Sequence, residues 1–372
     1  MEIREVKTRR DLRKFISFPD RLYAKCPQYV PALHADQMNM LTKDAALEYC
    51  EQKMWIAVDA RGNVYGRICA MINPHYNERY GTRHCRFGWF DVVEDYELAH
   101  NLIRTAERWA KSKGMTRIHG PLSYNTLGKQ GMLVEGFENV PQANTIYNFA
   151  YYPEFLERMG FVKECDWLQY KILQTEATDR VRNIAARLKE RYKLHSEDMD
   201  KIKNDPERVK QFLHAYNEIF SRSVYNFIPF TEAEMEQEAK ASLSMIRSDY
   251  CTVLCEENGD IAAFGICFPS LSAALQKAKG HMFPTGWYHL LKALKSDDNP
   301  VADLMIMGGA EKWEGKGITA LIHCDLEEKF RKLHIEYNIT NPQIETNKAV
   351  NVWSTYSNEP YMRRRCYIKD ID

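Results

Sequence analysis

The sequence predicts an α/β chain, in detail α+β, of two similar tandem domains, each a mixed central sheet flanked by helices. Two hairpins turn at Ala60–Asn63 and at Glu257–Asp260, and the return strand of each contains an Ile-Cys pair. The order helix, hairpin, strand, helix, strand, helix, strand occurs twice, as in a duplicated domain. At 372 residues the chain is long enough for two ordinary cores.

Composition and charge narrow the class of protein. The chain is 45% hydrophobic and 27% charged, which is typical of a soluble globular protein. Its 51 Lys and Arg residues balance 51 Asp and Glu residues, so we expect no nucleic-acid partner. No apolar run reaches about 18 residues and no apolar leader follows Met1, so we expect neither a membrane partner nor secretion.

The ten cysteines are dispersed through the chain. The closest pair, Cys251 and Cys255, has no second pair at the spacing of a zinc site. Dispersed cysteines are typical of proteins of the reducing cytoplasm. We therefore expect a cytoplasmic protein with no disulfide framework and no metal.

Alternation and capping signals define the first predicted domain, residues 1–174. Met54–Val58 and Val64–Ile72 form its hairpin, and Phe87–Val93 is the next strand. Asp95 can cap the following helix, which Gly114 ends. The other elements predicted here are the strand Glu2–Val6, the helix Thr8–Phe15, a helix within Ala35–Glu51, the strand Thr116–His119, the helix Tyr151–Met159 and the strand Asp166–Leu173.

The stretch Leu122–Asn148 has little regular pattern and is unusually long for a connection inside a domain. It carries Tyr124, Asn125, Tyr147 and Asn148. These side chains could wall a pocket for an acceptor substrate. The stretch could equally be a packed structural excursion, and the sequence leaves both readings open.

The polar stretch Gln174–Asp179 fits a short linker, so the second predicted domain spans residues 175–372. Its elements follow the same order as those of the first domain. They are the helices Val181–Tyr192, Pro206–Ser221 and Glu232–Ile246, the hairpin Cys251–Glu256 and Ile261–Phe268, the strand Ala302–Met307, the helix Ile318–Leu333, the strand Glu336–Thr340, the helix Lys348–Tyr356 and the strand Tyr361–Ile368.

The most informative stretch is Lys312–Ile318, between the strand Ala302–Met307 and the helix after it. Gly315 and Gly317 allow the backbone to approach a ligand closely. The unpaired N–H groups and the dipole of the first helical turn attract anions, and Lys312 and Lys316 add positive charge. We predict that a phosphate-bearing ligand binds at this loop.

A nucleotide-triphosphate loop is excluded by the same residues. That pattern is Gly-x-x-x-x-Gly-Lys-Ser/Thr, whose Ser or Thr hydroxyl holds magnesium. Here Ala310 stands at the first position and Gly317 at the last, so the pattern fails twice.

With these residues the second half resembles the GCN5-related N-acetyltransferase (GNAT) superfamily. Its loop Gln/Arg-x-x-Gly-x-Gly/Ala is similar to Lys312–Gly317, and Ile318, Asn347 and the basic strand Arg363–Ile368 also fit. The first half resembles the family only in its end pattern, Tyr151–Phe161, and its junction Phe90–Asp95 has no Gly-x-Gly. The chain therefore looks like a GNAT tandem in which only the second domain keeps the acyl-CoA loop.

The resemblance implies acetyl-CoA as the acyl donor and no metal. Tyr356 is the first candidate for the acid that protonates the leaving thiolate and Tyr361 the second, while Glu345 is a candidate base. Each could instead be a packed or solvated side chain, and Asn347 could simply cap the last helix. The residues implied to bind coenzyme A are Met307, Gly308, Gly309, Ala310, Lys312, Gly315, Lys316, Gly317, Ile318 and Asn347.

The implied function is an acyl-CoA-dependent N-acyltransferase that moves an acetyl group to an amine of a small molecule or peptide. We expect a monomer or homodimer. One alternative is a non-catalytic protein of the same fold that binds coenzyme A or acts as a scaffold, because Glu314 stands where the family often has Arg. Transfer of a longer acyl or an aminoacyl group is another alternative.

Overall fold

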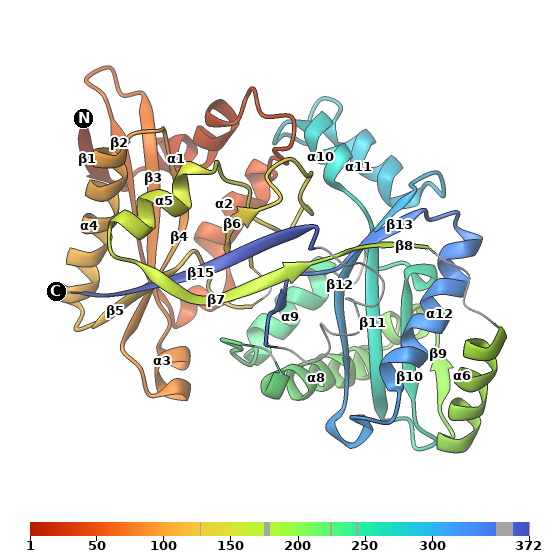
Figure 1. The fold of residues 1–372 in the computed structure, drawn as a ribbon. Helices are drawn as coiled ribbons and strands as arrows, with labels where there is room; N and C mark the ends of the chain where they lie inside the picture. The colour runs from red at the N-terminus through yellow and green to blue at the C-terminus, as the bar shows by residue number, and fades with distance from the viewer. Residues whose placement is uncertain (127, 175–178, 224, 243–244, 347–359, 372) are drawn as a thin grey trace. The chain divides into compact units, whose positions relative to one another are not determined.

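The structure, a computed structural model, describes residues 1–126, 128–174, 179–223, 225–242, 245–346 and 360–371 (Figure 1). The chain forms two compact units that are interleaved in sequence. Unit 1 comprises Met1–Leu168, Ser272–Leu290 and Pro360–Asp372, and unit 2 comprises Gln169–Leu271 and Leu291–Glu359. The sequence predicts instead one boundary after residue 174, because linker composition cannot show that two later segments return to the first half.

Unit 1 is built on a mixed sheet whose strands lie in the order β1-β2-β3-β4-β5-β15-β7, with β6 also pairing with β15. The first four strands are antiparallel, and β4 and β5 are parallel. The strands are β1 (Glu2–Glu5), β2 (Glu51–Val58), β3 (Val64–Ile72), β4 (His84–Val92), β5 (Arg117–Gly120), β6 (Met132–Glu135), β7 (Val162–Gln169) and β15 (Met362–Asp370).

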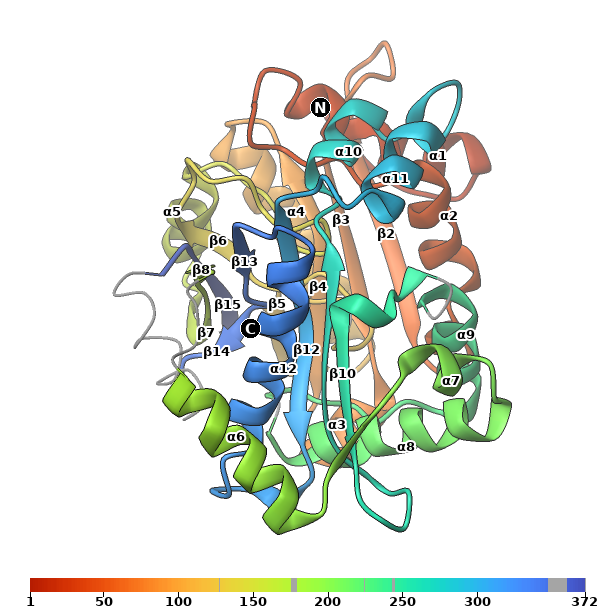
Figure 2. The same ribbon diagram turned by 90° about the vertical axis from the view of Figure 1, so that its right-hand side faces the viewer.

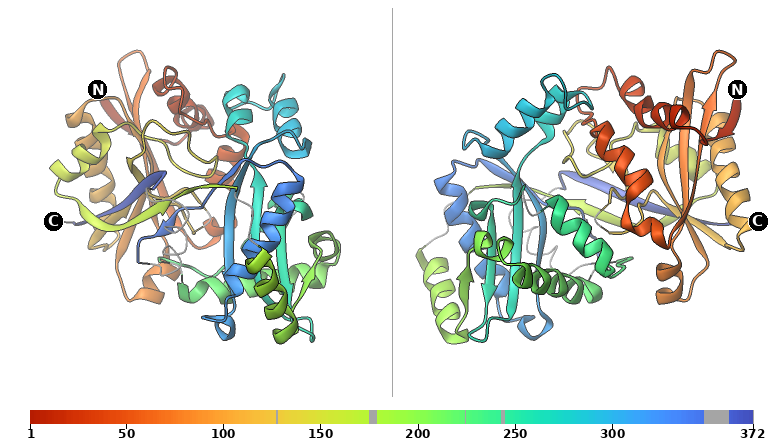
Figure 3. Two further views of the ribbon diagram at one scale, coloured as in Figure 1. Left: turned by 45° about the vertical axis from the view of Figure 1, so that its right-hand side comes forward. Right: turned by 180° about the vertical axis from the view of Figure 1, so that it is seen from behind.

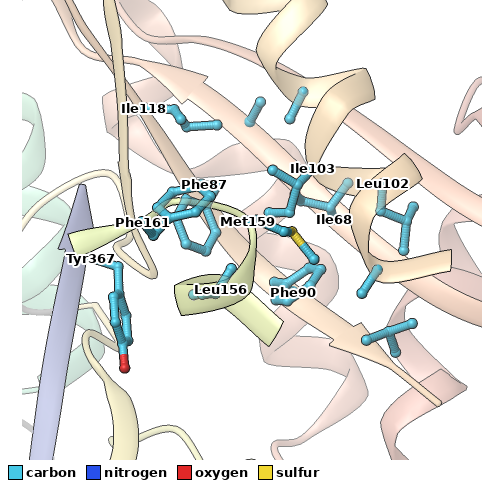
Figure 4. Packing of buried hydrophobic residues seen from close by; sticks show 14 of the residues in the cluster. Ile68, Phe87, Phe90, Leu102, Ile103, Ile118, Leu156, Met159, Phe161 and Tyr367 are labelled. Carbon is cyan, nitrogen blue, oxygen red and sulfur yellow. The ribbon is translucent and has the colours of Figure 1, made fainter. Parts of the chain in front are cut away.

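Helices cover both faces of this sheet (Figures 1 and 3). On one face α4 packs through Leu102 and Ile103, joined by Leu156 of α5, as Figure 4 shows. On the other face lies α1, with Phe15 and Ile16 buried. The helices of the unit are α1 (Arg9–Leu22), α2 (His34–Lys43), α3 (Pro74–Tyr80), α4 (Tyr96–Ser112), α5 (Tyr151–Arg158), α10 (Ser272–Ala278) and the first half of α11 (Gly286–Lys295), whose residues from Leu291 on belong to unit 2. Residues of β2 and β3 alternate between the two cores, as the pleat of a strand requires.

The last strand, predicted to close the second domain, belongs to the sheet of unit 1. In β15, Tyr367 pairs with Gly120 and Ile368 pairs with His119 of β5. Tyr367 enters the core beneath α4 and α5 (Figure 4). Its strand character is predicted correctly, but alternation in a sequence does not specify which sheet edge a strand pairs with.

Unit 2 has a second mixed sheet, in the order β8-β13-β12-β11-β10-β9, whose strands are labelled in Figure 1 and seen from another side in Figure 2. The predicted strand Asp166–Leu173 is divided between β7 of unit 1 and β8 of unit 2. The elements are β8 (Lys171–Leu173), β9 (His195–Glu197), β10 (Cys251–Cys255), β11 (Ile261–Pro269), β12 (Val301–Gly309), β13 (Tyr337–Ile339) and the short β14 (Gln343–Ile344), with helices α6 (Asp179–Tyr192), α7 (Met199–Lys203), α8 (Pro206–Ser223), α9 (Glu232–Ser242) and α12 (Ile318–Lys332).

Glycines allow helices to pack closely on both faces of this sheet. A Cβ at Gly265 would lie 2.6 Å from Ile322 of α12, and a Cβ at Gly308 would lie 2.6 Å from Ile219 of α8. Since Gly308 pairs with Phe264, next to Gly265, the two glycines face opposite sides. The predicted fold class, mixed sheets flanked by helices, is confirmed. None of the described helices combines the length and the hydropathy needed to cross a bilayer.

Candidate functional site

Within the described part of unit 2, the end of strand β12 has a free edge. β12 pairs with β13 only through Val301, Ala302 and Asp303, whereas its pairing with β11 continues to Gly309. Among the described residues no strand pairs with the β13 side of β12 beyond Asp303. Backbone groups along the rest of that edge can therefore bond a ligand.

The loop that follows β12 has the conformation expected of an anion site. Gly315 and Gly317 have φ of +71° and +79°, in the left-handed region that glycine adopts without strain. Space around a Cβ at Gly315 is open, while a Cβ at Gly317 would lie 3.3 Å from Leu188. Helix α12 then begins at Ile318 with no side-chain cap and no acidic residue in its first turn. Its first amides are therefore available to an anion.

The two lysines of the loop differ in their surroundings. The Lys312 ammonium lies 2.7 Å from a Glu256 carboxylate oxygen, and the same oxygen accepts a hydrogen bond from Trp313 Nε1 at 3.0 Å. The bond from Glu256 raises the pKa of Lys312. Lys316 is exposed, with its ammonium 4.9 Å from the centre of the Trp313 ring. Trp313 is buried and contacts Tyr192, so this indole anchors the loop.

In unit 1 the parallel strands β4 and β5 separate as β12 and β13 do in unit 2, but no glycine loop follows β4. β4 and β5 pair at His84–Arg86, and the Leu122 amide still donates to the Phe87 carbonyl at 2.8 Å. Beyond that point β4 bulges, with Trp89 at φ +45°. Helix α4 starts with its N-cap Asp95 accepting from Leu98 N–H, in a turn that also carries Glu97. Negative charge at this helix end disfavours a phosphate.

A pocket lies where β4 and β5 separate in unit 1. It encloses about 790 Å³ of space, part of it open to solvent. Aromatic and aliphatic side chains make up most of its wall: Tyr23, Tyr29, Trp89, Phe90, Tyr147, Val30, Met40, Leu122, Met132 and Ile146. Tyr147 and Asn148, two of the four residues singled out in the irregular stretch Leu122–Asn148, lie on this wall. Tyr124 and Asn125 do not.

The charged groups of the pocket are Asp91, Arg67 and Lys129, and the Tyr23 hydroxyl also lines it. The Asp91 carboxylate accepts from Arg67 Nε at 2.7 Å and from the Tyr23 hydroxyl at 2.9 Å. Burial, with smaller contributions from the cations Arg364 and Arg67, lowers the pKa of Lys129 to about 8. Within the described residues no hydrogen-bond or ion-pair partner reaches the Lys129 ammonium. The pocket thus pairs one satisfied carboxylate with one available amine.

Known proteins share this architecture. No model of a protein family matches the sequence. The chain is 29% identical over 381 residues to "Protein YghO" of Escherichia coli, covering 99% of this chain and 95% of that protein. It is 28% identical over 316 residues to "Bacterial ceramide synthase" of Caulobacter vibrioides, covering 83% and 80%.

The solved structures that cover the whole chain include the following two. One is a "Tandem GNAT protein from the clavulanic acid biosynthesis pathway", with a TM-score of 0.55, 13% identity and 98% of its own chain covered. The other is a GCN5-related N-acetyltransferase from Sphaerobacter thermophilus, with a TM-score of 0.55, 10% identity and 95% covered. This chain has the tandem GNAT fold. The resemblance seen in the sequence is therefore confirmed for the fold.

Within the tandem GNAT fold, the predicted coenzyme A residues Met307–Ala310 and Lys312–Ile318 lie along one continuous path, the end of β12 and its loop. Two of them have packing reasons to be glycine. Gly308 makes room for α8, and a Cβ at Gly309 would lie 3.0 Å from Ile318. The Ala310 amide donates to the Ala262 carbonyl at 2.9 Å, and the Ala310 carbonyl accepts from the Trp313 amide at 2.8 Å, so both backbone groups of Ala310 already have partners.

Of the predicted catalytic residues, Glu345 and Tyr361 lie in the described part of the chain, one in each unit. Tyr356 and Asn347 lie outside the described residues. Glu345 is half-buried just after β14. Tyr361 lies in unit 1, where its hydroxyl donates to the Val140 carbonyl at 3.0 Å. The roles of all four stay predictions.

A buried polar cluster in unit 1 was not predicted. His84, His119 and Glu164 offer atoms within 4.8 Å of one another, and His84 Nδ1 and His119 Nε2 have no hydrogen-bond partner in the described structure. Such a set can hold a divalent metal. Arg86, however, is buried beside it and already brings positive charge to Glu164, which weakens the case for a cation.

The sequence left a pocket at the stretch Leu122–Asn148 open as one of two readings, but it did not identify the charged residues of the pocket, because they lie far apart in the chain. A usable signal existed: Arg67 and Asp91 are charged residues inside otherwise apolar strands, where they need a partner. Lys129 sits in the irregular stretch and has no pattern that marks it.

Proposed function

We propose that this protein is an acyl-CoA-dependent N-acyltransferase whose donor site is the end of β12 and the loop Lys312–Ile318. The observation that carries the proposal is the uncapped start of α12 behind two glycines in left-handed conformation, at the end of a strand with a free edge. The likeness to acyltransferases of the tandem GNAT fold supports acyl transfer in general.

The residues present fit a coenzyme A thioester. The amides at the start of α12 and the exposed Lys316 suit its pyrophosphate, and the free backbone edge of β12 suits an amide-containing arm. The thioester would supply an activated acyl group. An amine forms the new C–N bond as the C–S bond breaks, the ammonium proton passes to a base, and the thiolate takes up a proton.

The acceptor we favour is an amine on a long apolar chain. A relative 28% identical to this chain is named bacterial ceramide synthase, and a ceramide is a long-chain amino alcohol acylated on nitrogen. The pocket of unit 1 has a mostly aromatic and aliphatic wall with a few polar groups, which suits such a molecule. Lys129, whose pKa is lowered to about 8, is a second candidate acceptor of the ammonium proton, in addition to the sequence-based candidate Glu345.

Calorimetry with coenzyme A tests the donor site. Gly315→Asp places a carboxylate in the loop and should weaken binding at least about tenfold through repulsion of phosphate and strain at positive φ. Gly259→Asp is the matched control, because Gly259 also has positive φ with open space around it but lies in the hairpin turn. Equal affinity in both variants would remove the loop from the proposal.

Thiol release tests the reaction. Acetyl-CoA, the donor that the sequence predicts, should be compared with a long-chain acyl-CoA, each with a long-chain amino alcohol and with a short amine. We expect the fastest turnover with the long-chain amine. Coenzyme A binding without turnover on any amine would favour the non-catalytic alternative.

A further inference from the structure

An apolar patch is exposed at the helical pair α10–α11 and the turn between its two helices. Phe283 is 80% exposed, Tyr288 53%, Trp287 44%, Leu291 44% and Met282 37%. Large apolar side chains exposed elsewhere in the described chain are scattered singly, whereas these five fall within ten consecutive residues. Scattered exposure needs no explanation, but a contiguous patch marks an interaction surface.

The patch follows from the positions of its residues in helix α11 and in the turn before it. Leu291 follows Trp287 by four positions and Tyr288 by three, so the three side chains lie on one face of α11. Leu290 and Gly286 are buried and anchor the opposite face. Trp287 Nε1 donates to the Pro284 carbonyl at 2.9 Å, which holds the indole against the turn that presents Phe283.

Within the segment that carries the patch, the charged residues have one sign. From Ser272 to Ser296 the chain has no Asp or Glu, although acidic and basic residues balance over the whole sequence. The basic residues of this segment are Lys277, Lys279, Lys292 and Lys295, all exposed. Exposed aromatic rings edged by lysines match the interface of a bilayer that carries anionic lipids.

We propose that residues 272–295 dock this protein on an anionic phospholipid bilayer, with Phe283 and Trp287 entering the interface and the lysines facing the headgroups. A second copy of the chain fits the patch less well, because a two-fold contact would bring lysine against lysine. The sequence predicts no membrane partner because no segment can span a bilayer, but docking from one side needs no spanning segment. The proposal uses no part of the coenzyme A site.

Co-sedimentation with vesicles tests the docking surface. The full chain should bind phosphatidylcholine vesicles that contain phosphatidylglycerol and should bind phosphatidylcholine alone at least about fivefold more weakly, since one lysine near an anionic surface contributes about that factor. Binding should fall as salt rises. Equal binding to the two kinds of vesicle, or none to either, would overturn the proposal.

Matched variants locate the surface. The double variant Phe283→Ser with Trp287→Ser should lose at least about tenfold in vesicle binding, because it removes two rings that bury in the interface. The double variant Tyr80→Ser with Val162→Ser removes two exposed apolar side chains elsewhere on unit 1 and should bind like the wild type. Similar loss in both would overturn the assignment.

Two readouts distinguish membrane docking from self-association and from a defect at the donor site. A concentration-dependent dimer that disappears in the Phe283→Ser, Trp287→Ser variant would assign the patch to a second copy and overturn membrane docking. Coenzyme A binding, measured by calorimetry on the same variant, should equal that of the wild type. A loss of vesicle binding with unchanged coenzyme A binding, or the opposite result, therefore tests the docking surface and the donor site independently.

Discussion

Single buried side chains distinguish the pocket of unit 1 from an ordinary core. A carboxylate that loses its hydration needs partners, and Asp91 has them in Arg67 and Tyr23. Lys129 has no such partner within the described residues, so burial acts on its charged form and lowers its pKa to about 8. The amine is therefore partly neutral near physiological pH, which a proton acceptor requires.

Replacing Lys129 tests this role. If Lys129 takes the ammonium proton, the wild-type rate should rise as pH increases through about 8, because only the neutral amine accepts. In Lys129→Gln the rate should fall by about 10² to 10⁴ and this rise should disappear. Lys25→Gln, at an exposed lysine, is the control. A variant with an unchanged pH–rate profile would exclude Lys129 from proton transfer.

His84 predicts a stability change at acidic pH. Burial, and to a smaller extent the nearby His119, lowers the pKa of His84 from 6.5 to about 4. The unfolded chain then binds a proton that the folded chain does not, so stability falls as pH decreases from 6.5 towards 4, by up to about 3 kcal/mol. When the free energy of unfolding is measured with urea between pH 6.5 and pH 4, it should fall less steeply with decreasing pH in His84→Gln than in the wild type. The exposed His195→Gln should keep the wild-type slope, and a loss unchanged by His84→Gln would contradict this prediction.

At the scale of elements, the starts of α4 and α12 show why one helix suits an anion and the other does not. Both follow the strand that separates from its parallel neighbour. The amides of α4 are capped by Asp95, whereas α12 starts after Gly317 with no side-chain cap. Capping stabilises α4 and occupies an amide that α12 keeps available for a ligand.

Removing the cap of α4 should therefore cost stability alone. Asp95→Ala is expected to lower the free energy of unfolding by about 0.5–2 kcal/mol, measured by urea unfolding. Glu94→Ala, at the exposed neighbouring residue, removes a carboxylate without removing a cap and should change it less. Coenzyme A affinity should be the same in both variants, and equal stability of the two would contradict the capping role.

The elements best predicted from the sequence are those with strong local signals. Both hairpins, the capped helix after Asp95 and the loop at Gly315 and Gly317 follow from turn chemistry and periodicity, and the structure has them at those places. Helices α3, α10 and α11 were not predicted. In α11 the apolar residues Trp287, Tyr288 and Leu291 are exposed. A prediction that assumes that the apolar face of a helix is buried therefore does not apply to α11.

At the scale of the whole molecule, the pairing of strands far apart in the chain could not be predicted from the sequence. The duplicated order of elements predicts two similar units, but it assigns β15 to the nearer one. The structure places it in unit 1, where Arg365 binds Asp166 through two hydrogen bonds of 2.8 and 3.0 Å. Local patterns specify that a strand forms, while its partner depends on contacts hundreds of residues away.

Deleting residues 360–372 tests this interleaving. The deletion removes Met362, Cys366 and Tyr367, each fully buried, and burial of three such side chains contributes about 5 kcal/mol or more. Unit 1 should lose its cooperative thermal transition. Deletion of Asp372 alone is the control and should leave that transition in place. An unchanged transition in the longer deletion would mean that β15 is dispensable for the sheet.

The position of β15 also sets an order of events during synthesis. Arg117 and Asp370, which form an ion pair at 2.6 Å, are 253 positions apart in the chain. The neighbouring edge of β5 therefore has no final partner until β15 has left the ribosome. During that interval the nascent chain carries an open strand edge, which chaperones or other chains can bind. Unit 1 therefore cannot complete its sheet until the segments of unit 2 that lie before β15 have been synthesised.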